Sequence, residues 1–232
     1  MNKESNSYIF IFAIVMVVVV AVLLSFTAIS LKPIQLKNIE LEKKKNILSS
    51  VHIPNTVSDA EKKYEKYIVK EFIVSSDGKA LEGDAFDINM KEELSKPLDK
   101  RKLPLLEAQL ETGKIYYIIP LRGTGLWGPI WGYVSLKDDL NTIYGVNFDH
   151  EGETPGLGAE ITKKYFQKQF KNKTLFDENH QFVSISTVKA AKTLTEHQID
   201  AISGATITSR GVANMIHDCI SGYLNYFKTI NK

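Results

Sequence analysis

Hydroxyl side chains gather in the stretch DAISGATITSRGV, from Asp200 to Val212. The turn Ser203-Gly204-Ala205-Thr206 follows a short apolar segment, and a helix is predicted to start near Thr208 or Ser209. A phosphate attached to Thr206 would lie beside the free backbone N–H groups of that helix, where the helix dipole favours negative charge. Helix capping by Thr208 or Ser209 explains the same hydroxyls equally well. The stretch therefore indicates either a phosphoryl attachment site or an ordinary strand-to-helix turn.

Two other glycine-rich stretches could approach a ligand closely. RGTGLWGPIWGY (Arg122–Tyr133) interleaves glycines with the only two tryptophans of the chain. Such a pattern lets the backbone approach a flat ligand while an aromatic ring covers it. EGETPGLGAEI (Glu151–Ile161) has a Pro-Gly turn and places Gly158 at a predicted helix start, so its N–H groups suit carbonyl or phosphate oxygens. The alternatives are a bulged strand pair with core tryptophans and a plain strand-to-helix turn.

Several common functional sites are absent from the sequence. The five histidines show no metal-ligand spacing with each other or with the single cysteine, Cys219. There is no P-loop, no dinucleotide-binding glycine motif and no G-x-S-x-G nucleophile elbow. The formal net charge of +2 lacks the basic excess typical of nucleic-acid binding. We therefore expect no metal, no catalytic residue and no nucleic-acid partner.

The segment Tyr8–Leu31 contains no charged residue over 24 positions. A helix of this length crosses a hydrocarbon core of roughly 30 Å, whereas the apolar core of a cleaved signal peptide is usually only about 7–15 residues. We expect a short tail over 1–7, a transmembrane helix over 8–31 and one domain over 32–232. Only Lys3 precedes the span, but five lysines follow it within twenty residues: Lys32, Lys37, Lys43, Lys44 and Lys45. Taken alone, the positive-inside rule places the large domain in the cytoplasm.

The remaining chain predicts an α+β domain with a twisted, mostly antiparallel sheet flanked by helices. Apolar spacing predicts a helix over 33–51, a Ser58/Glu61 capping box starts a second helix, and 159–171 and the C-terminus are also helical. In the last helix Val212, Ile216, Cys219 or Ile220, Tyr223 and Phe227 form an apolar stripe. Strands are expected over 70–76, 85–90, 113–121, 130–136, 141–150, 181–187 and 198–202.

The motifs, taken in order, resemble a known family. DAISGAT is similar to the Asp-x-x-Ser/Thr-Gly-Ala-Thr sequence that the bacterial flavin transferase recognises. That enzyme moves an FMN phosphoryl group from FAD onto the threonine hydroxyl. Together with ETPGLG, GLWGPIWGY and the single span, the chain resembles the C subunit of the sodium-translocating NADH:quinone oxidoreductase, over nearly its whole length.

The resemblance implies a role for each matching residue. Thr206 is expected to carry FMN covalently, as a phosphoester. Four residues match what the transferase reads: Asp200, Ser203, Gly204 and Ala205. Thr208 and the amides near Ser209 are expected at the phosphate. The loop residues expected against the flavin are Thr154, Leu157 and Gly158, and Leu126 and Trp127 are further candidates.

The resemblance also implies a role for the whole chain. It would belong to a respiratory complex, would not be catalytic on its own, and would pass electrons through FMN. Its partners would be the other subunits, the flavin transferase during maturation and membrane lipid. The soluble domain would face the periplasm from the bacterial inner membrane, contrary to the lysine count. Two alternatives are the G subunit of the Rnf-type ferredoxin:NAD oxidoreductase and a membrane-anchored binding or structural module without redox function.

Overall fold

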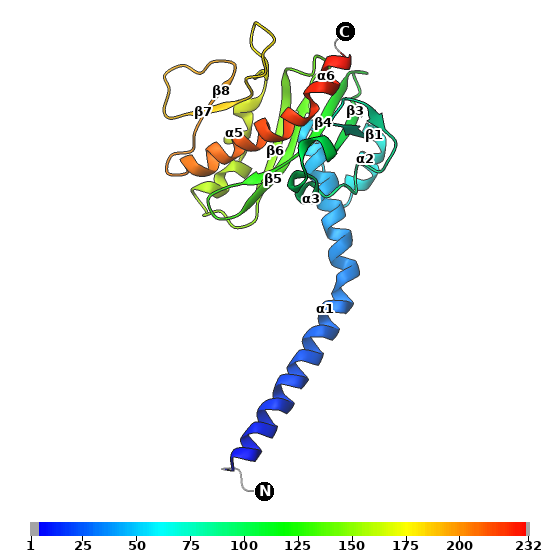
Figure 1. Ribbon diagram of the computed structural model, residues 1–232, viewed down its shortest axis with the longest axis vertical. Helices are drawn as coiled ribbons and strands as arrows, with labels where there is room; N and C mark the ends of the chain where they lie inside the picture. Colours follow the sequence, from blue (N-terminus) through cyan, green and yellow to red (C-terminus); the bar gives the residue numbers. More distant parts are fainter. Residues whose placement is uncertain (1–4, 231–232) are drawn as a thin grey trace. The chain divides into compact units, whose positions relative to one another are not determined.

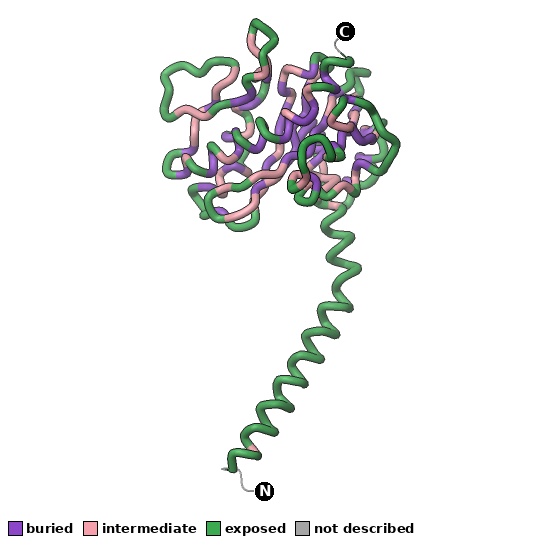
Figure 2. Tube along the Cα trace, viewed as in Figure 1, coloured by how far each residue is buried: buried purple, intermediate pink, exposed green. Residues whose placement is uncertain are grey.

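The computed structural model describes residues 5–230, and these divide into two compact units, one up to Lys43 and one from Lys44 onward. Helix α1 (Asn6–Ser50) begins in the first unit and ends in the second. The predicted span and the helix expected after it are therefore one element, with Pro33 inside it. Within residues 5–230, α1 is the one helix long and apolar enough to cross a membrane. Apart from Tyr8 and Leu41, which have intermediate burial, its apolar residues before Lys43 are exposed, and Figure 2 shows this part of the helix almost entirely as exposed.

The second unit is built on a six-stranded antiparallel sheet with the order β2-β1-β3-β4-β5-β6 (Figure 1). The strands are β1 (Ile68–Ser75), β2 (Ala80–Leu81), β3 (Lys102–Gln109), β4 (Ile115–Thr124), β5 (Pro129–Leu136) and β6 (Ile143–His150). Enrichment in β-branched and aromatic residues predicted β1, β4, β5 and β6 correctly. Strand β3 was missed because its sequence, KLPLLEAQ, contains a proline and no β-branched or aromatic residue.

The strand predicted over 85–90 is wrong. The Asp84 carboxylate accepts hydrogen bonds from the backbone N–H groups of Phe86 and Asp87, which makes a turn. The Asn89 side chain then caps helix α3 (Met90–Ser95) by accepting from Lys91 N at 3.1 Å. Local side-chain hydrogen bonds therefore replace the strand ladder here.

Two helix predictions also need correction. Helix α2 (Ala60–Tyr67) begins without a capping box, because Asp59 is its N-cap residue and makes no side-chain cap bond. The helix predicted over 159–171 is broken into three pieces, a 3-10 helix (Gly158–Thr162), α4 (Lys164–Gln167) and a second 3-10 helix (Lys168–Phe170). The break is at Lys163, whose backbone is extended (φ −83°, ψ 144°).

The C-terminal third carries the last elements. Strands β7 (Ser186–Val188) and β8 (Gln198–Asp200) pair in parallel. The strand expected over 181–187 is therefore present only at its last two residues, Ser186 and Thr187. Helix α5 (Thr206–Ile220) continues through a 3-10 turn (Ser221–Tyr223) into α6 (Leu224–Ile230). Every member of the predicted apolar stripe is buried. Burial also raises the pKa of the Cys219 thiol to about 11.

The sheet separates two hydrophobic clusters. One lies between the sheet and α5, which crosses one sheet face in Figure 1, and it includes Phe166 and Phe170 of the broken helical segment. The other packs the end of α1, through Ile47 and Leu48, and Tyr64 of α2 against β3 and β4. Both faces of the sheet are thus covered, and the start of α5 is held at one end of the first cluster.

Candidate functional site

Helix α5 begins at Thr206, two or three residues before the start predicted near Thr208 or Ser209. Its N-cap residue, Ala205, makes no side-chain cap bond. The first bond into the helix runs from Ser209 N to Ala205 O at 2.9 Å, so the N–H groups of Thr206, Ile207 and Thr208 precede the intrahelical ladder. Helix capping by Thr208 or Ser209 is therefore wrong. The three N–H groups before the first intrahelical bond are of the kind that bind anions at helix N-termini.

The hydroxyls around this helix start have different partners. Thr208 Oγ1 is buried and donates to Glu153 Oε2 at 2.6 Å. Ser209 Oγ is buried, donates to Ala205 O at 3.0 Å and accepts from Ile202 N at 3.0 Å. Thr206 is half-buried, and its hydroxyl has no hydrogen-bond partner within residues 5–230. Thr206 is therefore the hydroxyl of the first helical turn that is free to react.

Glu153 joins the three glycine-rich stretches. Its side chain is only 4% exposed, and Oε1 accepts from Trp127 N at 2.9 Å while Oε2 accepts from Thr208. A Cβ atom on Gly125 would lie 2.4 Å from Oε1, and a Cβ atom on Gly158 would lie 2.0 Å from Oε2. These two glycines are thus required because the carboxylate approaches their backbones closely. One buried carboxylate fixes the loop after β4, the loop after β6 and the start of α5.

Sequence reasoning missed Glu153. A glutamate in a turn-rich segment is usually solvated, so its type alone carries no signal. The pattern that could have found it is the pair of glycines at Gly125 and Gly158, each of which leaves space for a neighbouring group. Glu153 N also donates to His150 Nδ1 at 3.2 Å, which ties the loop to the end of β6.

Large apolar side chains are exposed on the segments that Glu153 joins. Leu126 is 48% exposed, Trp127 69%, Leu157 41% and Ile207 59%. The loop of Leu157 meets the turn before α5, because a Cβ atom on Gly204 would lie 2.7 Å from Leu157 Cδ2. Exposed apolar groups beside backbone N–H donors and one free hydroxyl fit a ligand with a phosphate and a flat ring system. The backbone donors, the free hydroxyl and the exposed apolar side chains therefore suit FMN.

The remaining predicted site residues occupy the same region. Ser203, Gly204 and Thr154 are exposed, whereas Ala205 and Gly158 are buried. Gly204 has φ +77°, a conformation that favours glycine, so the turn before Thr206 depends on it. The structure thus brings Leu126, Trp127, the loop 153–158 and the turn 203–209 together through their contacts with Glu153 and Leu157.

Asp200 has a structural role in the chain. Its Oδ1 accepts from Ala190 N at 2.8 Å, which fixes the loop between β7 and β8. Gln169 holds the Asp200 backbone with two bonds, accepting from Asp200 N at 2.8 Å and donating to Asp200 O at 3.3 Å. The strand that leads to Thr206 is therefore clamped from the broken helical segment.

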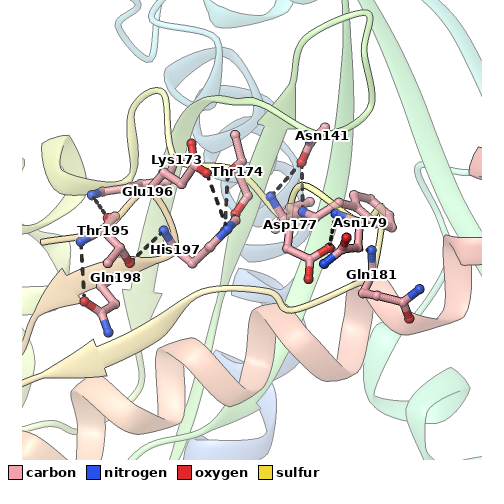
Figure 3. A network of polar contacts seen from close by, with 12 residues as sticks. Asn141, Lys173, Thr174, Asp177, Asn179, Gln181, Thr195, Glu196, His197 and Gln198 are labelled. Atoms are coloured by element: carbon pink, nitrogen blue, oxygen red, sulfur yellow. Dashed lines mark hydrogen bonds and ion pairs between the residues drawn. The ribbon is translucent and has the colours of Figure 1, made fainter.

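A polar network fixes the segment before β8 (Figure 3). His197 Nδ1 lies 2.8 Å from Thr174 O, and Thr174 N donates to Glu196 O at 3.0 Å. The Asn141 side-chain oxygen accepts from Leu175 N and Phe176 N on the same loop. These bonds join three loops and so set where β8 begins.

No metal centre accompanies this site. Within residues 5–230 no group of three or more His, Cys, Asp or Glu side chains is placed to hold a metal ion.

Comparison with known proteins points to one family. The family model "FMN-binding domain" matches residues 125–221, which include the first glycine-rich stretch from Gly125 onward and the other two completely. The Na(+)-translocating NADH-quinone reductase C subunit from Haemophilus ducreyi is 31% identical, over 92% of this chain and 89% of that protein. The Vibrio anguillarum protein of the same name is 31% identical, over 91% and 89%.

Solved structures agree with the sequence relatives. The crystal structure of the C subunit of this reductase from Parabacteroides distasonis matches with a TM-score of 0.79 and 40% identity, over 85% of this chain and 96% of that chain. Shewanella oneidensis NqrC matches with a TM-score of 0.70 and 25% identity, over 83% and 97%. The predicted fold class, an α+β domain with an antiparallel sheet after an N-terminal apolar helix, is confirmed.

Proposed function

The chain belongs to the family formed by the C subunit of the Na(+)-translocating NADH-quinone reductase, and we propose that Thr206 holds its FMN by a phosphoester bond. It is a flavoprotein subunit of that reductase and is not catalytic alone. The other subunits are its partners. When bound, FMN supplies electron transfer, whereas the chain binds the cofactor, orients it and shields part of it from water.

The free hydroxyl of Thr206 is the observation that carries this proposal. In the attachment reaction the Thr206 oxygen bonds to the phosphorus of the FMN half of FAD. The bond between the two FAD phosphates breaks, AMP leaves, and the hydroxyl proton passes to a base on the transferase. The resulting negative phosphodiester would be stabilised by the N–H groups that precede the first intrahelical bond of α5.

The other site residues take supporting roles in this proposal. Thr208 contributes its backbone N–H to the phosphate, because its hydroxyl proton is already donated to Glu153. Ser209 stabilises the turn through Ala205 and Ile202 and brings its neighbouring amides to the phosphate. The exposed apolar side chains and the loop around Gly158 would face the flavin ring: Leu126, Trp127, Thr154 and Leu157. The transferase would read Asp200, Ser203, Gly204 and Ala205.

The apolar part of α1 would anchor the protein in the bacterial inner membrane. We propose that residues 8–31 cross the lipid once, that 1–7 form a short tail, and that the domain after residue 31 faces the periplasm, where the transferase acts. The lysines after the span oppose this orientation. A reporter fused to the C-terminus should be active in the periplasm, and activity confined to the cytoplasm would overturn the orientation.

The attachment can be tested with one gel. The chain is coexpressed with a flavin transferase, denatured and examined for flavin fluorescence, beside Thr206→Val and Thr187→Val as a matched control. Fluorescence should remain in the unmutated and Thr187→Val proteins and disappear in Thr206→Val. Fluorescence that survives Thr206→Val would exclude this attachment site. Its absence from all three would favour a binding module without covalent flavin.

A further inference from the structure

A cavity of the second unit is separate from the proposed flavin site. It has a volume of about 620 Å³ and lies at the β6 edge of the sheet. Its walls come from the chain just after α1 (His52–Asn55), from Asn147 of β6 and from the broken helical segment between Thr162 and Lys171. None of the residues that surround Thr206 lines it. The cavity is therefore available for a second function.

The lining of this cavity is strongly basic. Lys164, Lys168 and Lys171 line it, spaced four and three residues apart along the broken helical segment, and no acidic residue does. Within residues 5–230 these three ammonium groups have no ion pair or hydrogen bond. Three like charges around one hollow repel each other, so a bound anionic group would relieve that repulsion.

A second, smaller cavity extends the basic surface. It has a volume of about 270 Å³, shares Lys171 with the first and adds Lys114 and Lys137. Lys137 Nζ donates to Asn172 Oδ1 at 3.0 Å, so this side chain is held in place. Asp138 is the one acidic residue that lines either cavity. The two cavities therefore meet at Lys171, and we call their combined lining the β6-edge basic groove.

A solvated helix face would explain single lysines but not this arrangement. Helix α4, which carries Lys164, has only four residues, so its dipole gives little stabilisation to the lysines near its C-terminal end. The lysines also share the cavity wall with amide and imidazole groups from two other segments, Asn55, Asn147 and His52. A concave surface lined by charges of one sign concentrates the electrostatic potential at the position of a bound group.

We propose that the β6-edge basic groove binds an acidic segment of another subunit of the reductase. Membership of an assembly of several subunits is established for this family, so the chain needs surfaces that contact its neighbours. An extended segment with two or three Asp or Glu residues would place its carboxylates among the three lysines and its backbone against the amides of the wall. The volume of the larger cavity lies within the range of about 300–1,000 Å³ that specific ligand sites occupy.

The test compares two sets of charge reversals in the full complex. The tagged full chain is expressed with the other subunits and the flavin transferase, and the amount of each copurifying subunit is measured at low and moderate salt. One variant carries Lys164→Glu, Lys168→Glu and Lys171→Glu. The control carries Lys62→Glu, Lys91→Glu and Lys100→Glu, which change three exposed lysines away from both cavities by the same charge.

The amount of the other subunits that copurify with the groove variant should fall at least tenfold, while its covalent flavin is kept. The control should keep both its subunits and its covalent flavin. The corresponding Lys→Gln variant should lose less, and its difference from the unmutated chain should shrink as salt rises, because salt screens the ion pairs that only the unmutated chain makes. Full copurification of the groove variant, or an equal loss in the control, would overturn the proposal. Inorganic pyrophosphate binding without any effect of the lysines on assembly would also overturn it.

Two further readouts keep the test decisive. If the Glu substitutions abolish folding, the Gln variant decides, because it removes the charges without reversing them. Failure of flavin attachment in the unmutated chain would contradict the assignment of Thr206 and leave the copurification measurement intact. Loss of subunits confined to the groove variants would support the groove in either case.

Discussion

Replacing Glu153 by leucine tests the central contact of the candidate site. The substitution keeps most of the side-chain volume but leaves two donors, Trp127 N and Thr208 Oγ1, without their acceptor. Thr208 is only 1% exposed, so water cannot replace the lost bond there. An unsatisfied buried donor costs about 1–3 kcal/mol, and the part-buried Trp127 N–H adds a smaller amount. We expect a total loss of about 2–4 kcal/mol of unfolding free energy.

Thermal unfolding of the full chain in detergent measures this loss. For a domain of this size about 1 kcal/mol corresponds to roughly 2–4 °C, so Glu153→Leu should lower Tm by roughly 4–16 °C. Glu151→Leu is the matched control, because Glu151 is exposed two residues away and should change Tm by less than about 2 °C.

A double-mutant cycle separates this contact from a general packing defect. Thr208→Val removes the buried donor, so adding it to Glu153→Leu should cost less than the sum of the two single changes by about 1 kcal/mol or more. If Glu153→Leu unfolds within about 2 °C of the unmutated chain, or if the two changes add fully, the carboxylate does not join these segments.

Three further predictions concern other parts of the domain. Gly158→Ala places a Cβ atom 2.0 Å from Glu153 Oε2 and should cost about 1–3 kcal/mol in thermal unfolding and reduce flavin attachment; unchanged values would show that the loop can move away. Tyr223→Phe removes a buried hydrogen bond to Pro104 O at 2.7 Å and should cost about 1 kcal/mol in urea unfolding, with no effect on flavin. Although burial opposes it, hydrogen bonds from Lys102 N and the Lys96 ammonium lower the pKa of the Glu93 carboxyl. Its stabilising effect is thus present at neutral pH and lost as pH falls below the ordinary glutamate range, so Glu93→Gln should show a weaker acid dependence of Tm than the unmutated chain.

The strands were predictable where β-branched and aromatic residues are concentrated, and the last helix where an apolar stripe recurs. Strands β4 to β6 have such a composition, and the stripe of α5 recurs every three or four residues, so both patterns are visible locally. Strand β3 has a proline and no β-branched or aromatic residue, and the 85–90 turn depends on Asp84 and Asn89 side chains that bond to nearby backbone. In both cases the deciding interaction has no periodic signal.

The candidate site was only partly predictable. The motif around Thr206 is local, so its residues could be named from sequence. The helix start was misplaced because Ser209 bonds back to Ala205 and Ile202 instead of capping. Glu153 was not predicted, since its partners come from segments 26 and 55 residues away and only the glycines at Gly125 and Gly158 point to it. Its role exists only after the sheet and α5 bring those segments together.

Mass analysis of one peptide tests the covalent attachment most directly. Trypsin releases Thr193–Arg210, which contains Thr206 and the other hydroxyls of the motif. After coexpression with a flavin transferase this peptide should gain the mass of FMN less water, with fragment ions that place the gain on Thr206. A peptide of unmodified mass, or a gain on Ser203, Thr208 or Ser209, would contradict the assignment.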